Sequence, residues 1–267
     1  MEAEVLRRKI DVKGVCTTSR GAVLLGVLGR APALEVGGVA KRFCGYGWLS
    51  DCVVINDLIY AFGYGGIVVD GGLREIKRTV FIGAEYAAAD GKLIYVVAEG
   101  GLLVFDAELQ LRAKIGGKFY DVAADAEGGG VYVLGIRELY LIDEGRLRPA
   151  YRLDATMGAA SFVLAYGGEL YVSAARGLAR LDAPSLKERA FSPKLRGAAA
   201  VVGDYVVSVY GDAVRVADRD SLSVLAELKL PGITAGFAKA RSIGGRILTP
   251  AYAGAKNFWG HVLEIAP

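Results

Sequence analysis

The sequence predicts an all-β protein built from one repeated unit, and three observations lead to this prediction. Patterns with the helical period of 3.6 residues are absent from end to end, whereas short apolar runs bounded by turn residues are frequent. Segments of one kind recur at nearly constant spacing. The chain has 267 residues, 53% of them hydrophobic, which is enough to bury a sizeable core and excludes both a disulfide-stapled miniprotein and a disordered tail.

The repeated unit consists of an apolar run, a turn rich in glycine or charge, a second apolar run and a closing aspartate. It is clearest in LIYAFGYGGIVVD and LIYVVAEGGLLVFD. Each unit is preceded by a run of small apolar residues and followed by a basic alternating strand. Four strands in about 37 residues, joined by hairpin turns, are typical of a β-propeller blade. The closing aspartates, separated by 36, 37, 39 and 36 residues, are Asp70, Asp106, Asp143, Asp182 and Asp218.

Counting the units predicts a single domain, residues 1–267, folded as a seven-bladed propeller with four-stranded blades. The C-terminal part supplies only three strands, and the basic segment EAEVLRRKI at the N-terminus supplies the fourth. Pairing the two closes the ring and removes an exposed edge. Six blades are the alternative, if the short first unit is not a blade. The expected blades cover residues 13–44, 45–82, 83–117, 118–156, 157–194, 195–230, and 231–267 together with 1–12.

In this arrangement the sequence resembles the propeller superfamily of YVTN-type and quinoprotein-like repeats, which is WD-repeat-like at the level of the fold. The family pattern is a YV…G…vid core followed by a turn and an outer strand, and LIYVVAEGGLLVFD matches it. The resemblance covers nearly the whole chain. It implies a propeller and no particular activity, because the WD dipeptide, the paired glycines of kelch blades and the Trp-docking repeats of quinoprotein enzymes are missing.

No catalytic motif is visible, and we expect neither a cofactor nor a metal ion. The chain has one histidine, no GxSxG elbow and no GxxxxGK[ST] loop. The closing aspartates recur at strand ends, which favours turn caps over a carboxylate centre. An enzyme, either a hydrolase or a lyase with its site at the mouth of the central channel, is the alternative. Its residues would be Glu85, Asp121, Arg241 and His261.

The three cysteines, Cys16, Cys44 and Cys52, have no CxxC spacing, so a zinc site is disfavoured. We expect them to be small buried hydrophobic residues. A disulfide between Cys44 and Cys52 is the alternative, since intracellular proteins of hyperthermophiles do contain disulfides. The low content of Gln, Asn and Met is typical of such organisms and predicts a thermophilic source.

The basic residues are concentrated on the expected outer strands. Seven windows with 51 residues in total contain 16 of the 32 Lys and Arg, although the net charge is only +3. One interpretation is a nucleic-acid-binding rim. The favoured interpretation is edge protection, because Lys and Arg on outer strands block edge-to-edge aggregation.

Propeller ligands usually bind one face, formed by the loops from an outer strand to the next inner strand and by the turns between second and third strands. We call it the upper face. We expect a non-enzymatic scaffold that presents aromatic and arginine side chains there to a protein or peptide partner. Alternatively, Trp48 and Phe258 merely cover the core. The expected binding residues are Tyr46, Trp48, Tyr64, Arg137, Arg176, Lys256, Phe258 and Trp259.

The sequence contains no apolar run of the length that a membrane helix needs, and its charged N-terminus does not resemble a secretory signal. We therefore expect a cytoplasmic protein without membrane contact. The oligomeric state is left open, because outer strands could pair between molecules.

Overall fold

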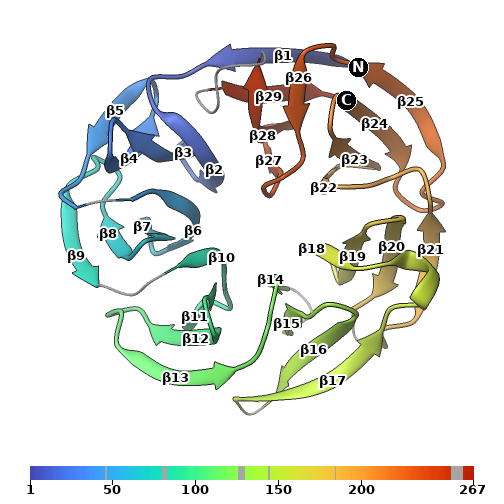
Figure 1. Ribbon diagram of the computed structural model, residues 1–267, viewed down its shortest axis with the longest axis horizontal. Helices are drawn as coiled ribbons and strands as arrows, with labels where there is room; N and C mark the ends of the chain where they lie inside the picture. Colours follow the sequence, from blue (N-terminus) through green and yellow to red (C-terminus); the bar gives the residue numbers. More distant parts are fainter. Residues whose placement is uncertain (46, 80–82, 126–129, 144, 184, 254–260) are drawn as a thin grey trace.

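The structure is a computed structural model that describes residues 1–45, 47–79, 83–125, 130–143, 145–183, 185–253 and 261–267. Its strands form seven antiparallel sheets arranged as a ring around a central channel (Figure 1). The predicted seven-bladed propeller is confirmed, and the alternative of six blades is wrong. The described part of the chain has no helical segment with the length and apolar character that a bilayer crossing requires.

Blades 1 to 6 each contain four strands in the order inner, second, third and outer, and the neighbouring strands pair in that order. Blade 1 comprises β2 (Asp11–Thr18), β3 (Gly21–Leu28), β4 (Ala31–Val36) and β5 (Val39–Arg42). Blade 2 comprises β6 (Leu49–Ile55), β7 (Leu58–Gly63), β8 (Gly66–Val69) and β9 (Glu75–Thr79). Blade 3 comprises β10 (Ala84–Ala89), β11 (Leu93–Ala98), β12 (Gly101–Asp106) and β13 (Leu111–Gly116).

The next three blades continue the same order around the ring. Blade 4 comprises β14 (Asp121–Ala124), β15 (Val131–Leu134), β16 (Glu138–Asp143) and β17 (Arg146–Arg152). A short 3-10 helix, η1 (Ala155–Met157), leads into blade 5. Blade 5 comprises β18 (Ala160–Tyr166), β19 (Glu169–Ala174), β20 (Gly177–Asp182) and β21 (Glu188–Ser192), and blade 6 comprises β22 (Ala198–Val202), β23 (Tyr205–Tyr210), β24 (Ala213–Asp218) and β25 (Val224–Lys229).

Blade 7 closes the ring with strands from both ends of the chain. Its inner position is divided between β26 (Ile233–Ala235) and β27 (Arg241–Ile243), and both pair with β28 (Arg246–Ala253). The third strand is β29 (His261–Ala266), and β1 (Glu2–Arg7) is the outer strand. The register between β29 and β1 runs without interruption from Glu2 opposite Ala266 to Arg7 opposite His261. The N-terminal strand therefore completes the C-terminal blade, as predicted.

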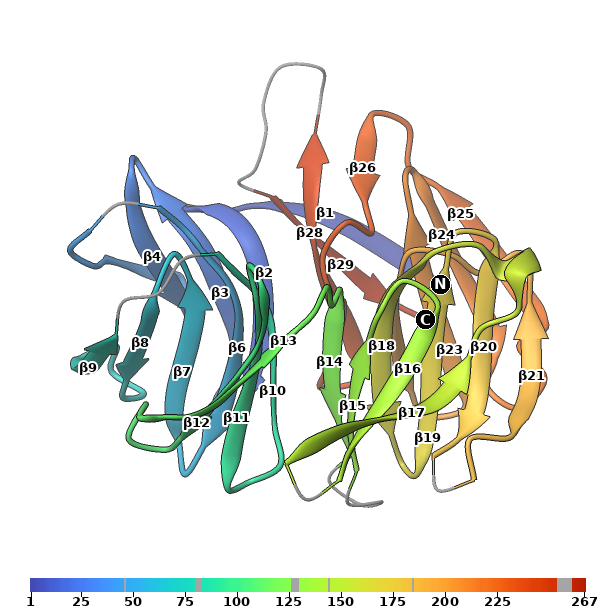
Figure 2. The ribbon, with the colours of Figure 1, turned by 60° about the horizontal axis from the view of Figure 1, so that its bottom comes forward.

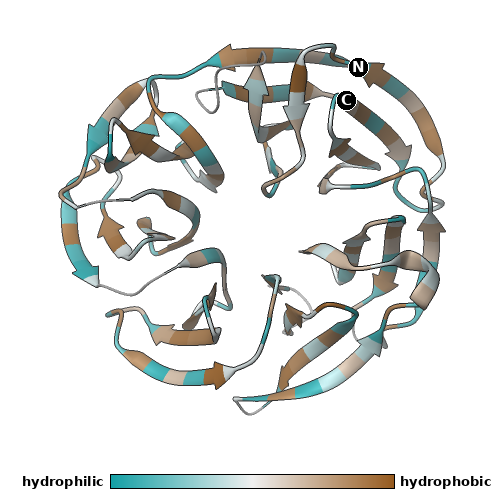
Figure 3. Cartoon of the chain, in the orientation of Figure 1, coloured by the Kyte–Doolittle hydropathy of each residue, from teal (hydrophilic) through white to brown (hydrophobic). Residues whose placement is uncertain are grey.

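The core lies between successive blades. One cluster, for example, joins Val23 and Leu34 of blade 1 to Leu49, Ile59 and Ile67 of blade 2. The alternation of apolar and polar residues along each strand puts the apolar side chains into these layers. The outer strands β9, β13 and β17 carry hydrophilic segments on the rim (Figure 3).

The turns from third to outer strands explain the recurring aspartates. Asp70 Oδ1 accepts hydrogen bonds from the backbone N–H groups of Gly72 (3.0 Å) and Arg74 (2.8 Å). Leu73 in the same turn adopts a left-handed conformation, φ 62°, yet is buried. Burying a leucine contributes about 2 kcal/mol, which offsets a conformational cost of about 1 kcal/mol. The turn-cap role is thus confirmed for Asp70, and backbone N–H groups also bond the carboxylates of Asp106, Asp182 and Asp218.

Candidate functional site

The upper face is the side of the ring on which each inner strand begins. Inner strands run from this face to the lower face, and second strands return to it, so the turns between second and third strands also lie here. It is the upper side of the molecule in Figure 2, where β28 ends. Within the described residues, the loops from outer to inner strands and the turns between second and third strands therefore share one side of the ring.

Two of the expected binding residues, Trp48 and Tyr64, form an exposed aromatic pair on the upper face. Their ring centroids are 4.6 Å apart and their planes meet at 66°, an edge-to-face arrangement. The exposed fraction is 41% for Trp48 and 47% for Tyr64. Two large aromatic residues are seldom exposed side by side. Where they are, they usually belong to a binding surface. We call these two residues the aromatic pair.

Glycines next to the aromatic pair make its geometry possible. Gly47 has φ 107°, and a Cβ atom there would lie 2.7 Å from the Cβ and Cγ of Tyr64. A Cβ on Gly63 would lie 2.0 Å from the Trp48 carbonyl oxygen. That oxygen accepts the backbone N–H of Tyr64 at 3.1 Å. The loop before β6 and the turn after β7 are thus held against each other by close backbone contact.

The aromatic pair separates two cavities, to both of which Trp48 and Tyr64 contribute. The first has a volume of about 180 Å³ and lies toward blade 1, between Pro32, Cys44 and Arg78. The second has a volume of about 220 Å³ and opens at the mouth of the central channel. We call the second one the mouth cavity. Its wall also includes Lys13, Ser50, Glu85, Tyr86 and Phe237.

The mouth cavity is aromatic with few charges. Phe237 stacks on Tyr252 with the ring centroids 4.2 Å apart. Burial lowers the pKa of Lys13 to about 8, against a smaller opposing effect of Asp11. A pocket with aromatic walls and a few polar groups is the usual form of a site that receives an apolar side chain.

The other expected binding residues divide into two groups. Arg137, in the turn between β15 and β16, and Arg176, in the turn between β19 and β20, are exposed on the upper face. They belong to blades 4 and 5 and are not part of the aromatic pair or of its cavities. Tyr46, Lys256, Phe258 and Trp259 lie outside the described residues.

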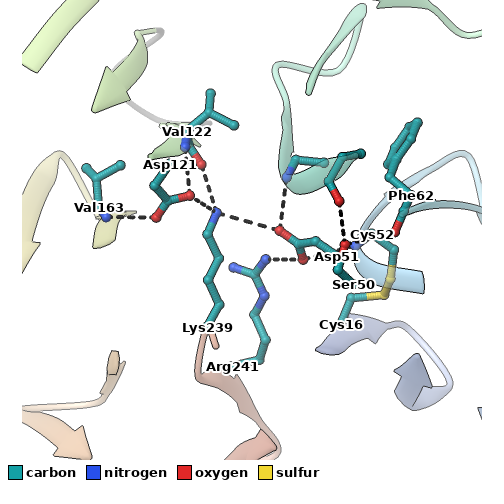
Figure 4. A network of polar contacts seen from close by, with 12 residues as sticks. Cys16, Ser50, Asp51, Cys52, Phe62, Asp121, Val122, Val163, Lys239 and Arg241 are labelled. Atoms are coloured by element: carbon teal, nitrogen blue, oxygen red, sulfur yellow. Dashed lines mark hydrogen bonds and ion pairs between the residues drawn. A yellow bond between two sulfur atoms is a disulfide. The ribbon is translucent and has the colours of Figure 1, made fainter. Parts of the chain in front are cut away.

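Below the mouth cavity, a cluster of charged side chains crosses the channel (Figure 4). Lys239, which precedes β27, is 9% exposed. Its Nζ lies 2.6 Å from Oδ1 of Asp121 on β14 and 3.7 Å from Oδ2 of Asp51 on β6, and it donates to the Val122 carbonyl oxygen at 2.9 Å. Lys239 therefore joins blade 7 to blades 2 and 4.

Arg241 and the two aspartates extend this cluster to six blades. Arg241 Nη2 contacts Asp51 Oδ1 at 2.8 Å, and its Nε donates to the Val15 carbonyl oxygen of blade 1 at 3.3 Å. Asp51 Oδ2 accepts the N–H of Ala87 in blade 3, and Asp121 Oδ2 accepts the N–H of Val163 in blade 5. We call Asp51, Asp121, Lys239 and Arg241 the channel cluster.

The channel cluster contains two carboxylates and two cations, so its formal charges cancel. Each carboxylate contacts a cation and also accepts a backbone N–H group. Burial raises the pKa of the Asp121 carboxyl, and the Lys239 ammonium and two backbone amides act against that rise. Charged groups that are this buried persist only when paired and hydrogen-bonded. These side chains are therefore suited to holding the blades together.

A third cavity, of about 320 Å³, lies in the lower half of the channel. On β6, Ser50 lines the mouth cavity, Asp51 belongs to the channel cluster, and Cys52 lines the lower cavity. On β10, Tyr86 lines the mouth cavity and Ala87 the lower one. The channel cluster thus lies between the mouth cavity and the lower cavity.

The four residues of the enzyme alternative do not form one site. Asp121 and Arg241 belong to the channel cluster, whereas Glu85 is exposed on the upper face beside the mouth cavity. His261 lies on β29, the third strand of blade 7, and is separated from the channel by β28 and β26. The four residues are not brought together. Within the described part of the chain, no group of three His, Cys, Asp or Glu residues could hold a metal ion.

The expectation of buried cysteines is confirmed for Cys16 and Cys52, each 3% exposed, and the alternative of a Cys44–Cys52 disulfide is wrong. The disulfide joins Cys16 on β2 to Cys52 on β6, with a Cα–Cα distance of 5.8 Å, and Cys44 is exposed and free. Cys16 and Cys52 are 36 residues apart, which is one repeat. Equivalent positions on neighbouring inner strands face each other, so the repeat length was the signal that could have identified the partner.

Four arginines of the basic outer strands are neutralised by turn aspartates. Arg74 pairs with Asp70 at 3.2 Å, and Arg189 pairs with Asp182 at 3.6 Å. Pairs of the same kind join Arg112 to Asp106 and Arg148 to Asp143. The rim is therefore less cationic than its sequence indicates, which favours edge protection over a nucleic-acid footprint.

Comparison with protein-family models and with curated proteins finds no match to this chain.

Proposed function

We propose that this propeller is a binding scaffold that holds a peptide segment of a protein partner on its upper face. The observation that carries the proposal is the aromatic pair, Trp48 and Tyr64, exposed between two cavities. Trp and Tyr are enriched among the residues that dominate binding energy at interfaces, because each buries a large area at little cost in conformational entropy.

The rigidity of the surroundings supports the same function. Tyr64 is held to the Trp48 loop by backbone contact, and the channel cluster fixes the inner strands below it. A surface that is already ordered loses little entropy when it binds a partner. The mouth cavity, of about 220 Å³, has room for one apolar side chain of a partner beside the aromatic pair.

The experiment is selection of a phage-displayed library of random 12-residue peptides on the immobilised protein. The affinity of each selected peptide is then measured by fluorescence anisotropy. We expect the double variant Trp48→Ala/Tyr64→Ala to bind the selected peptides at least ten-fold more weakly than wild type, because truncating such aromatic anchors typically costs about 2 kcal/mol.

The control variant is Tyr205→Ala/Leu225→Ala, which removes two side chains of comparable exposure, 42% and 60%, away from the upper face. It should bind like wild type. Failure of the library to yield any binding peptide, or equal binding by wild type and Trp48→Ala/Tyr64→Ala, would overturn the proposal.

A further inference from the structure

The upper face carries an unneutralised basic arc across three neighbouring blades. Its five members are exposed and lie in upper-face loops: Lys118 before β14, Arg137 after β15, Arg176 after β19, and Lys194 and Arg196 before β22. Blades 4, 5 and 6 follow one another around the ring (Figure 1). We call these five residues the basic arc.

The basic arc differs from the basic outer strands in its partners. Four outer-strand arginines pair with turn aspartates, whereas no member of the basic arc forms an ion pair with any carboxylate in the described ranges. Lys118 approaches the ring of Tyr120, and Arg196 Nε donates to the Pro193 carbonyl oxygen at 3.4 Å. Five like charges on one face repel one another, and an anionic partner would relieve that repulsion.

The carboxylates of the molecule gather on the opposite side. The turns of the lower face carry most of the aspartates in the described ranges, and nearly all recurring ones are used as caps there. Along blades 4 to 6 the upper-face loops also hold the exposed Asp154 and Asp212, which the five residues of the basic arc outnumber, so the field there is positive on balance. Such a field attracts and orients an oppositely charged segment.

We infer that the partner segment is acidic, with an apolar or aromatic residue on the aromatic pair and its Asp or Glu residues on the basic arc. This inference rests on the proposed function and adds the chemistry of the occupant. Blade 3 lies between the aromatic pair and the basic arc, and it presents Glu85 and Glu99, both exposed, on the upper face. The part of the segment that crosses blade 3 is therefore neutral.

The two glutamates of blade 3 also favour a peptide over a nucleic acid. A single-stranded nucleic acid carries a phosphate at each nucleotide, so a strand that reached from the arc to Trp48 would place negative charge against Glu85 and Glu99. A peptide can place neutral residues there and acidic residues only over the arc. Charge complementarity therefore points to an acidic peptide.

The test uses the peptides selected on wild type. We expect them to be enriched in Asp and Glu at one end and to contain an apolar or aromatic residue separated from that acidic run by neutral residues. The variant Arg137→Glu/Arg176→Glu/Arg196→Glu should bind them at least ten-fold more weakly at 50 mM salt, and the difference from wild type should shrink at 500 mM salt.

A matched control keeps the net charge of the variants equal. Lys114→Glu/Arg146→Glu/Lys187→Glu makes the same change in charge at three exposed positions on or next to outer strands, and it should bind like wild type. Circular dichroism and urea unfolding of both triple variants show whether each is folded. If both triple variants lose the same amount of peptide affinity, net charge and not the basic arc governs binding, and the inference is overturned.

The remaining outcomes separate this inference from the proposed function. If the selected peptides are not acidic and bind the arc variant normally, but still require Trp48 and Tyr64, the inference fails and the scaffold function stands. If a 20-nucleotide single-stranded RNA binds more tightly than any peptide and is lost in the arc variant, the partner is a nucleic acid. If sedimentation shows self-association that the arc variant abolishes, the occupant is the acidic lower face of a second copy. Either result overturns the inference.

Discussion

Lys239 Nζ lies 2.6 Å from Asp121 Oδ1, and this contact joins the closing blade to a blade on the far side of the channel. Asp121 has no exposed surface and accepts two backbone N–H groups besides the ammonium. The contact therefore acts across the ring, in addition to the pairing of β1 with β29 along its rim.

Removing the ammonium should destabilise the ring strongly. Lys239→Met leaves the Asp121 carboxylate buried without its cation, and breaking such a pair costs about 3–5 kcal/mol. The double variant Asp121→Asn/Lys239→Met removes both charges and should be less destabilised than Lys239→Met alone. Urea unfolding followed by circular dichroism measures both. A loss below about 1 kcal/mol for Lys239→Met would contradict the role assigned to the channel cluster.

The disulfide should also stabilise the fold. Cys16 and Cys52 close a loop with a sequence separation of 36, and the chain-entropy relation gives about 4 kcal/mol for a loop of this size. We expect Cys16→Ala/Cys52→Ala to unfold at a lower urea concentration than wild type, and Cys44→Ala to match wild type. Thiol titration of the denatured, unreduced protein should detect one thiol. Three thiols would contradict the Cys16–Cys52 link.

The turn aspartates should make stability depend on acid pH. Backbone N–H groups of Arg74 and Gln110 lower the pKa of Asp70 and Asp106, and the Ser185 and Ser221 hydroxyls lower the pKa of Asp182 and Asp218. A carboxyl with a lowered folded-state pKa contributes stability that is present above its unfolded value, about 3.9, and is lost as the pH falls through the folded value.

The free energy of unfolding should therefore fall as the pH is lowered below about 4. The four-fold Asp→Asn variant at these positions keeps an acceptor oxygen but loses the titration, so its stability should vary less over the same range. Urea unfolding between pH 7 and pH 3 measures both proteins. Equal slopes for wild type and variant would contradict the prediction.

Gly47 should be required for the aromatic pair. Gly47→Ala places a Cβ 2.7 Å from Tyr64 in a backbone conformation, φ 107°, that alanine adopts at a cost, so Tyr64 must move. We expect peptide binding to weaken about three-fold or more while the protein stays folded. Gly203→Ala is the control, because Gly203 also has a positive φ, 56°, but has open space around its Cβ position. Anisotropy titration that finds both variants equal to wild type would contradict this role.

The sequence predicts the fold well because each repeat of the sequence corresponds to one blade of the structure. The number of blades and the closing strand follow from the spacing of the aspartates and from one missing strand, and both are confirmed. The alternative pairing of Cys52 with Cys44 is wrong because equivalence between blades, and not nearness along the chain, decides which inner-strand residues face each other. Cys52 is eight residues from Cys44 but opposite Cys16.

The site is only partly visible in the sequence. Loop type alone assigns Trp48 and Tyr64 to one face, and the structure brings their rings into contact. The channel cluster is harder to foresee, because Lys239 meets Asp51 and Asp121 only after the ring has closed. One signal was present: both aspartates interrupt an apolar inner strand at similar positions, two repeats apart. The basic arc is not visible as a cluster in the sequence because its members come from four separate loops.

The most direct measurement follows the fluorescence of Trp48 while a peptide binds. The chain has two tryptophans, so Trp259→Phe leaves Trp48 as the only one. A selected peptide without tryptophan is titrated into this variant, and the emission and its quenching by acrylamide are recorded. Because Trp48 is 41% exposed in the free protein, binding on the upper face should shift its emission to shorter wavelength and protect it from acrylamide. Unchanged emission and quenching at saturating peptide would contradict the assignment of this face as the binding surface.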